Sequence, residues 1–272
     1  MPYEIKPPRG LIRINFKELW RYRELFYIFV WRDIKVRYKQ TALGVVWAVF
    51  QPFLTMIIFS LFFGRLAKVP SEGIPYPVFV YAGLLLWNYF AAALTSSSDS
   101  LLANEGIIKK VYFPRLILPI SSTITPAIDF GISFLVLLAL MLYYRFTPTI
   151  VGILIMPVLL TVSLLCAAGI GFLLSSINVK YRDVRYILPF FIQIMLFLTP
   201  VIYPVSIIPA RFQWLAYLNP MTGLITIARA LLLHTGAVDW KLLPISLLVA
   251  LVLFLVGLFY FRKTERFFAD II

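Results

Sequence analysis

Six apolar runs dominate this sequence, and each is long enough, or nearly so, to cross a lipid bilayer. A helix needs about 20 apolar residues to span the hydrocarbon layer. The candidate spans are residues 44–64, 78–98, 116–143, 150–174, 186–204 and 242–261. Hydrophobic residues make up 61% of the chain and charged residues only 14%, whereas soluble domains are about 45–50% apolar. We therefore predict an all-α integral membrane protein with six transmembrane helices.

Residues 16–35 precede the first span and carry too many charges to cross the membrane. Helical spacing gathers Trp20, Tyr27 and Trp31 with other apolar side chains on one face, opposite most of the charged ones. A basic helix rich in aromatic residues is typical of a segment that lies in the membrane interface. An ordinary cytoplasmic helix packed on the bundle is the alternative. We favour an amphipathic interface helix.

Residues 200–235, between the fifth and sixth spans, are apolar but interrupted by four prolines. Such a segment is too broken for a simple span and too apolar for a solvated loop. Irregular backbone at membrane depth is tolerated only where protein or a water-filled cavity covers it. We predict a pair of short re-entrant helices here, at the outer face.

Lysine and arginine are unevenly divided between the two sets of loops. Residues 1–43 hold ten of them, and residues 99–115, 175–186 and the tail from 262 hold three each, which leaves six for the other side. Because cytoplasmic loops are enriched in Lys and Arg, we place both termini in the cytoplasm. The chain then divides into a cytoplasmic N-terminal segment, 1–43, and a six-span domain, 44–272. The net charge of +13 reflects this topology and contact with anionic membrane lipids, and we expect no nucleic-acid partner.

One charged element separates the second and third spans. Residues 104–115 read NEGIIKKVYFPR, a nearly helical pattern closed by Pro114. The charge distribution places this loop on the cytoplasmic side. We expect a short surface helix, with a merely solvated connector as the alternative.

Asp129 is the one acidic residue deep within a predicted span. Ser122, Thr125 and Ser133 fall on the same helix face, and ionisable groups in spans are expensive and often functional. This polar stripe faces a wet passage or a partner span in one interpretation. In the other, the hydroxyls bond their own backbone, and Asp129 is protonated or bonded across helices. The sequence leaves both open.

Chemistry on this chain is not expected. No G-x-x-x-x-G-K-[ST] phosphate-binding loop is present, so the sequence predicts no ATP site. His234 and Cys166 are the only residues of their types, which argues against a metal centre or a catalytic triad. We predict no catalytic residue, no metal and no cofactor on this chain.

Five motifs in order resemble the permease subunits of ABC exporters that move polysaccharides. They are WRDIKVRYKQTALGVVWAVFQP at 31–52, IIKKVYFPRLILP at 107–119, NVKYRDVRYILP at 178–189, LTPVIYP at 198–204 and NPMTGLI at 219–225. The resemblance runs from about residue 20 to 265. It is strongest to O-antigen export permeases, and the capsule and teichoic-acid export permeases share the pattern.

The resemblance implies a transport subunit of the inner membrane, not an enzyme. Two copies would form a passage for a lipid-linked polysaccharide of the O-antigen type. Two copies of a separate ATP-binding subunit, which carry the ATP and Mg, would dock from the cytoplasm. Residues 16–38 would lie along the interface, and residues 99–115 would dock on the ATPase. Residues 200–235, predicted above to lie at the outer face, stand where we expect an outer gate. The residues implied in coupling are Asn104, Glu105, Gly106, Ile107, Ile108, Lys109, Lys110, Arg32 and Asp33.

Aromatic faces suit a weakly held, sliding ligand such as a sugar chain. We assign to the translocation path Trp47, Gln51, Trp87, Asp129, Gln193, Phe197 and Tyr203. An integral-membrane enzyme acting on polyprenyl-linked sugars is the alternative, but it would need acids or histidines converging at one membrane face, and here the acids are scattered. An ion-driven secondary transporter is a third possibility. Such transporters usually have duplicated halves and more intramembrane charge than this sequence shows.

Overall fold

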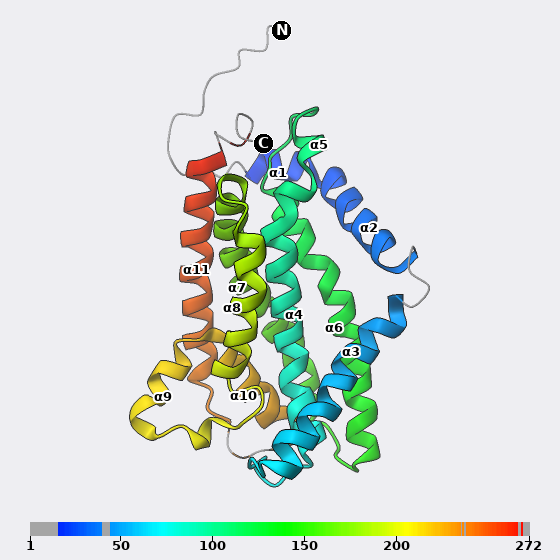
Figure 1. Ribbon diagram of the computed structural model, residues 1–272, viewed down its shortest axis with the longest axis vertical. Helices are drawn as coiled ribbons and strands as arrows, with labels where there is room; N and C mark the ends of the chain where they lie inside the picture. The colour runs from blue at the N-terminus through cyan, green and yellow to red at the C-terminus, as the bar shows by residue number, and fades with distance from the viewer. Residues whose placement is uncertain (1–15, 40–43, 235, 237, 266–267, 269–272) are drawn as a thin grey trace, which may run out of the picture.

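A bundle of long helices forms the body of the molecule (Figure 1). The computed structural model describes residues 16–39, 44–234, 236, 238–265 and 268, and every regular element within these ranges is helical. This confirms the all-α prediction. The bundle contains α4 (Tyr76–Ala103), α6 (Ile117–Tyr143), α7 (Ile150–Lys180) and α11 (Leu242–Thr264). The central helix is α4, since 78% of its most apolar stretch is buried inside the protein.

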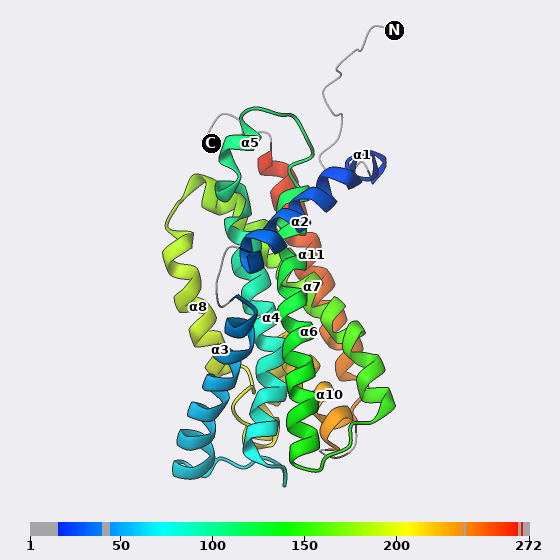
Figure 2. The same cartoon turned by 90° about the vertical axis from the view of Figure 1, so that its right-hand side faces the viewer.

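The first span lies against the outside of this bundle (Figure 2). It consists of α3 (Gly44–Phe59), which continues without a break into a π-helical turn, η1 (Ser60–Leu66). Only 11% of its apolar stretch is buried. Most of its apolar side chains therefore face away from the protein, as they would toward lipid or toward another subunit.

Five helices are long and apolar enough to cross a membrane. They match the predicted spans one to four and six. The predicted fifth span, 186–204, is shorter than expected because α8 (Val184–Leu198) has 15 residues and ends before Thr199 and Pro200. At about 1.5 Å per residue it covers about 22 Å, less than the hydrocarbon layer. The chain nevertheless runs along α8 from the end where α7 finishes toward the end where α9 and α10 lie (Figures 1 and 2).

Two short helices fill the broken segment between α8 and α11. A 3₁₀ turn, η2 (Val205–Ile207), leads into α9 (Ala210–Tyr217), and α10 (Pro220–Leu233) follows at an angle of 104°. Pro209 and Pro220 stand at or just before the first helical residue, where the missing N–H costs nothing. The prolines thus start these helices, and two short helices lie at the end of the bundle opposite the loop that holds residues 104–115. That they re-enter the membrane stays a prediction.

The N-terminal segment forms α1 (Phe16–Arg21) and α2 (Arg23–Lys39), which cross the other end of the bundle. Trp20, Tyr27 and Trp31 are exposed, whereas the fully buried side chain of these helices is Phe29, with Leu19 and Phe26 packed beside it and partly buried. Residues 26–31 are all apolar, so periodicity alone does not tell which side is buried.

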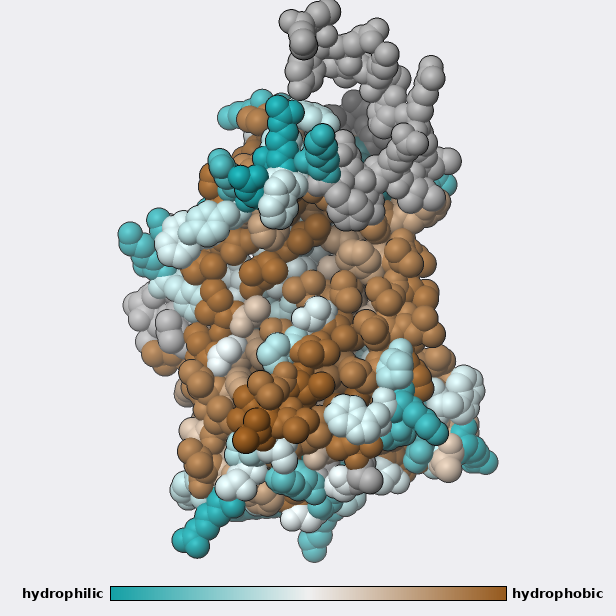
Figure 3. Space-filling model, turned by 180° about the vertical axis from the view of Figure 1, so that it is seen from behind, coloured by the Kyte–Doolittle hydropathy of each residue, from teal (hydrophilic) through white to brown (hydrophobic). Residues whose placement is uncertain are grey.

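An apolar belt separates two polar ends of the molecule, as Figure 3 shows. One end carries α2, the loop 104–115, the α7–α8 turn and the end of α11, with most of the described basic residues. Arg229 is one of the six basic residues that the sequence analysis assigned to the loops of the opposite side. It is instead 4% exposed within α10, so its charge says nothing about topology.

The crossing of α7 and α11 depends on two glycines. A Cβ on Gly257 would overlap the carbonyl of Gly169, and a Cβ on Gly169 would overlap the backbone at Phe254. Small residues of this kind let membrane helices approach closely.

Candidate docking surface and candidate cavity

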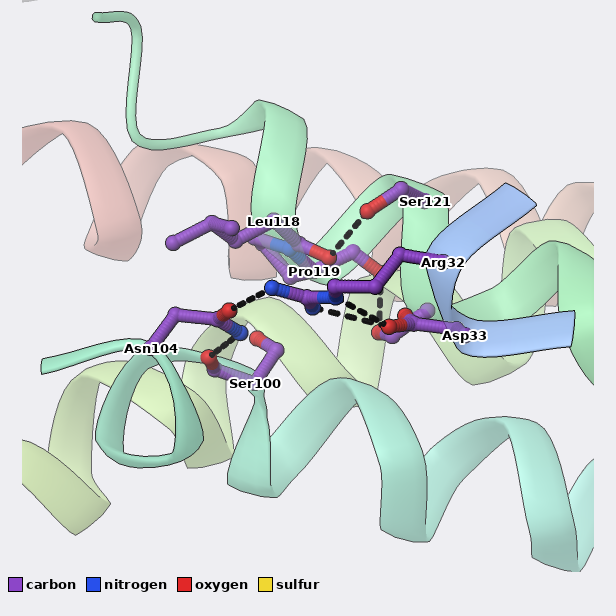
Figure 4. A network of polar contacts seen from close by, with 8 residues as sticks. Arg32, Asp33, Ser100, Asn104, Leu118, Pro119 and Ser121 are labelled. Atoms are coloured by element: carbon purple, nitrogen blue, oxygen red, sulfur yellow. Dashed lines mark hydrogen bonds and ion pairs between the residues drawn. The ribbon is translucent and has the colours of Figure 1, made fainter. Parts of the chain in front are cut away.

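Arg32 connects α2 to the end of α4 through a polar network (Figure 4). Its Nη1 donates to Asn104 Oδ1 at 2.7 Å, and its Nε and Nη2 donate to Asp33 Oδ1 at 2.9 and 2.7 Å. Asn104 in turn donates from Nδ2 to the Ser100 carbonyl at 2.7 Å. Arg32, Asp33 and Asn104 therefore form one contiguous unit, although they lie up to 72 positions apart in the chain. The resemblance implied all three in coupling.

The loop after Asn104 begins with a single helical turn, α5 (Glu105–Ile108). Lys109 Nζ donates to Glu105 Oε1 at 2.5 Å, a pair four residues apart on an exposed surface. The hydrogen bond from Lys109 lowers the pKa of the Glu105 carboxyl. Gly106 has open space where a Cβ would stand. This turn presents its charged side to the solvent.

The apolar side chains of the loop divide between the two sides of the chain. Ile107 and Val111 are exposed, whereas Ile108 is 8% exposed and belongs to a buried cluster with Phe29 and Phe113. Ile108 therefore anchors the loop on its own protein, and a partner has access to Ile107 and Val111.

Further contacts tie this loop to both ends of the chain. The rings of Phe113 and Phe29 lie 5.8 Å apart, and Tyr112 donates to Glu18 Oε1 at 3.3 Å. The guanidinium of Arg115 donates to the Glu265 carbonyl at the end of α11. Sequence reasoning missed Glu265, because its partner is 150 residues away.

A cavity of about 910 Å³ lies between α2, α3, α4, α6 and α8. Its lining includes aromatic, amide, hydroxyl and ionic groups. The polar and aromatic lining residues are Arg37, Trp47, Gln51, Asn88, Tyr89, Thr95, Ser96, Asp129, Phe130 and Ser133. Asn88 was missed by sequence reasoning, although it is the exposed residue in the otherwise buried stretch 78–90. A single amide in an apolar run is the signal that could have identified it.

Asp129 is bonded across helices at one end of this cavity. One of its carboxylate oxygens pairs with Arg37 and the other accepts from the Tyr38 hydroxyl, both on α2. Burial, together with the hydrogen bond to Asp129, raises the pKa of Tyr38 well above its ordinary value, so the phenol stays a donor. On the same face, Ser122 bonds its own backbone and Ser133 donates to the Ala48 carbonyl at 3.5 Å.

The residues assigned to the translocation path do not all meet in this cavity. Trp47, Gln51 and Asp129 line it. Gln193 and Phe197 are exposed on α8 outside the lining, and Trp87 is 3% exposed in the core, with its ring 5.6 Å from that of Phe90. Tyr203 donates to the carbonyls of Phe197 and Leu198 at 3.1 Å. The cavity thus gathers only part of the predicted set.

Arg229 holds the turn after α8. Its Nε donates to the Phe79 carbonyl at 3.1 Å, its Nη1 to the Pro200 carbonyl at 2.7 Å, and its Nη2 to the Val201 carbonyl. A Cβ at residue 83 would overlap this guanidinium, so Gly83 makes room for it. Pro200 and Val201 are both buried, so their carbonyls need a donor within the protein, and Arg229 supplies it.

The comparison with known families agrees with this architecture. A model of the ABC-2 type transporter family matches residues 24–233. The chain belongs to the ABC-2 type transporter family. The match includes α2, the loop 104–115 and the α9–α10 pair, so the elements described above are part of the family domain of this ABC-2 transporter.

Curated relatives of this ABC-2 transporter are export permeases. The O-antigen export system permease protein RfbA of Klebsiella pneumoniae is 30% identical over 92% of this chain and 95% of its own length. The protein of the same name from Myxococcus xanthus is 31% identical over 93% and 97%. The polysialic acid transport protein KpsM of Escherichia coli is 24% identical over 86% and 91%. This chain is therefore a multi-pass membrane permease homologous to polysaccharide exporters.

Proposed function

We propose that this chain is the transmembrane subunit of an ATP-driven exporter for a lipid-linked polysaccharide of the O-antigen type. Near-complete coverage of the O-antigen export permeases by this chain is the observation that carries the proposal. Two copies form a passage through the inner membrane, and both termini face the cytoplasm. The nearly unburied apolar surface of α3 leaves room for a second copy as its neighbour, although lipid could cover the same surface.

The energy source is a separate ATP-binding subunit, present in two copies. We define the docking surface as α5 and the loop that follows it, to Val111, with Arg32 and Asp33 of α2 behind it. Glu105, Lys109 and Lys110 set the register of the partner by charge, and Ile107 and Val111 supply apolar contact. The bonds from Arg32 to Asn104 and from Asn104 to Ser100 transmit a push on α5 directly to α2 and α4.

The remaining elements take complementary roles. The exposed aromatic face of α1 and α2, with Trp20, Tyr27 and Trp31, lies in the cytoplasmic membrane interface. The α9–α10 pair re-enters the membrane from the outer face and forms the outer gate. The cavity between α3, α4, α6 and α8 is one half of the passage, and Trp47, Gln51 and Asp129 belong to its wall.

Reconstitution tests this function. The chain and its co-expressed ATP-binding subunit are placed in proteoliposomes that contain a fluorescent lipid-linked O-antigen, and movement to the opposite leaflet is followed by quenching. We expect transport that requires ATP and both proteins. Equal transport with a partner that cannot hydrolyse ATP contradicts the proposal.

A further inference from the structure

The cavity contains formal charges that cancel. Among its described lining residues, the two with a formal charge at neutral pH are Arg37 and Asp129, and they form an ion pair with each other. The second carboxylate oxygen of Asp129 is occupied by the Tyr38 hydroxyl. Both charges are thus already engaged by protein groups, and the lining offers no net charge to a passing molecule.

The other polar groups of the lining are neutral. Gln51 and Asn88 supply amides, and Thr95, Ser96 and Ser133 supply hydroxyls. The side chains of Gln51 and Asn88 are both exposed. Among the described residues, neither amide has a hydrogen-bond partner. An amide both donates and accepts, which matches the hydroxyl groups of a sugar. Trp47 and Tyr89 add aromatic surface to the same lining.

A polyanion requires a different lining. Pores that pass anions use rings of Arg or Lys, because each acidic unit that leaves water must be compensated by a cation. In this cavity the Arg37 cation is neutralised by Asp129. The Asp129 carboxylate would also repel an acidic unit of a glycan. A second copy of the chain adds the same lining and the same zero balance.

We infer that the transported glycan is uncharged, and that glycans carrying a carboxylate or phosphate in each repeat are rejected. This inference rests on the proposed function, and it names the substrate class of the cavity described above. Selection operates through the absence of an unpaired cation among the described lining residues and through the Asp129 carboxylate, in addition to the neutral groups that hydrogen-bond the sugar.

The test compares two substrates in the same proteoliposomes. Both have the same lipid, the same linkage and the same length, but one consists of neutral hexoses and the other replaces one hexose per repeat with the corresponding uronic acid. Like charges brought together across an interface repel each other, so we expect the neutral glycan to be transported at least about tenfold faster. Equal rates overturn the inference and leave the proposed function standing, whereas transport of neither glycan contradicts the proposed function.

Variants that change the charge of the lining provide the second arm. Asn88→Lys adds a cation without touching the Arg37–Asp129 pair, and we expect it to raise the acidic-to-neutral transport ratio. Asn88→Gln is the matched control and should leave that ratio unchanged. Gln51→Lys repeats the experiment from α3 in case Asn88→Lys fails to assemble. An unchanged ratio in a lysine variant that assembles and still transports the neutral glycan contradicts the assigned role of the cavity.

Discussion

The guanidinium of Arg229 lies 3.7 Å from the centre of the Phe79 ring while its Nε bonds the carbonyl of the same residue. A cation over an aromatic face is favourable, and more so when both are removed from water. Within the described residues no carboxylate bonds this buried arginine. Its charge is balanced by the ring and by backbone carbonyls of α4 and of the turn after α8.

Removing Arg229 should therefore destabilise the half of the protein that holds α9 and α10. Arg229→Ala leaves the carbonyls of Pro200 and Val201 buried without the donor they now have, and each such loss costs about 1–3 kcal/mol. We expect a clear fall in the temperature at which the detergent-solubilised protein stops eluting as a single species. Lys241→Ala, an exposed change near the same end, is the control. Equal melting of the two variants contradicts the role of Arg229.

The bond between Arg32 and Asn104 predicts an uncoupling phenotype. Asn104→Ala removes the acceptor of the Arg32 hydrogen bond, an interaction of a charged group worth about 1.5–3 kcal/mol. We expect ATP hydrolysis by the complex to persist while export per ATP falls. Asn104→Asp keeps an acceptor for Arg32 but loses the donor to the Ser100 carbonyl, so it should restore only part of the export. An equal loss of export in Asn104→Ala and Asn104→Asp would count against transmission through Arg32.

Charge swaps separate a partner contact from an internal pair at Glu105 and Lys109. Glu105→Lys and Lys109→Glu each break the pair, and we expect both to weaken binding of the ATP-binding subunit. The double swap restores the internal pair but reverses its direction toward the partner. If the ATP-binding subunit recognises the charges of the docking surface, ATP hydrolysis stays uncoupled from export in the double variant. Full recovery in the double variant would mean that only the internal pair matters. An ion pair four residues apart on a helix surface contributes about 0.2–0.5 kcal/mol.

Close packing of α7 on α11 predicts a steric effect of a single methyl group. Gly257→Ala inserts a Cβ against the Gly169 carbonyl, and overpacking of this kind costs about 1–3 kcal/mol. We expect a lower thermal midpoint for the purified protein. Gly131→Ala on α6 is the control, because nothing lies within 4 Å of its added Cβ and alanine favours helix. A midpoint for Gly257→Ala at or above that of Gly131→Ala would refute this account of the crossing.

Several elements were predictable because their signal is local. Long apolar runs define the spans, since the bilayer demands length and composition from each segment independently of its neighbours. The prolines at 209 and 220 likewise mark the starts of α9 and α10. Asn104 closes α4 and is followed at once by the one-turn α5, as the charged motif between spans two and three predicts.

Other features depend on which segments the fold brings together. The side of α2 that is buried follows from Phe113 and Ile108 beneath Phe29, and no period in residues 26–31 encodes it. Arg229 appears in the sequence as a loop charge, and only the approach of Phe79 and of the turn at Pro200 turns it into a buried donor. Trp87 and Trp47 are both tryptophans of predicted spans, yet one is core and the other lines a cavity.

Sequence by itself thus determined that this chain is a helical membrane protein with one short charged element between its second and third spans. The tertiary structure alone decided that Arg32 meets Asn104 and that Arg37 neutralises Asp129, contacts that span 72 and 92 positions of the chain. The physical reason is that the bilayer acts on each segment separately, whereas hydrogen bonds and ion pairs between helices depend on how those helices pack.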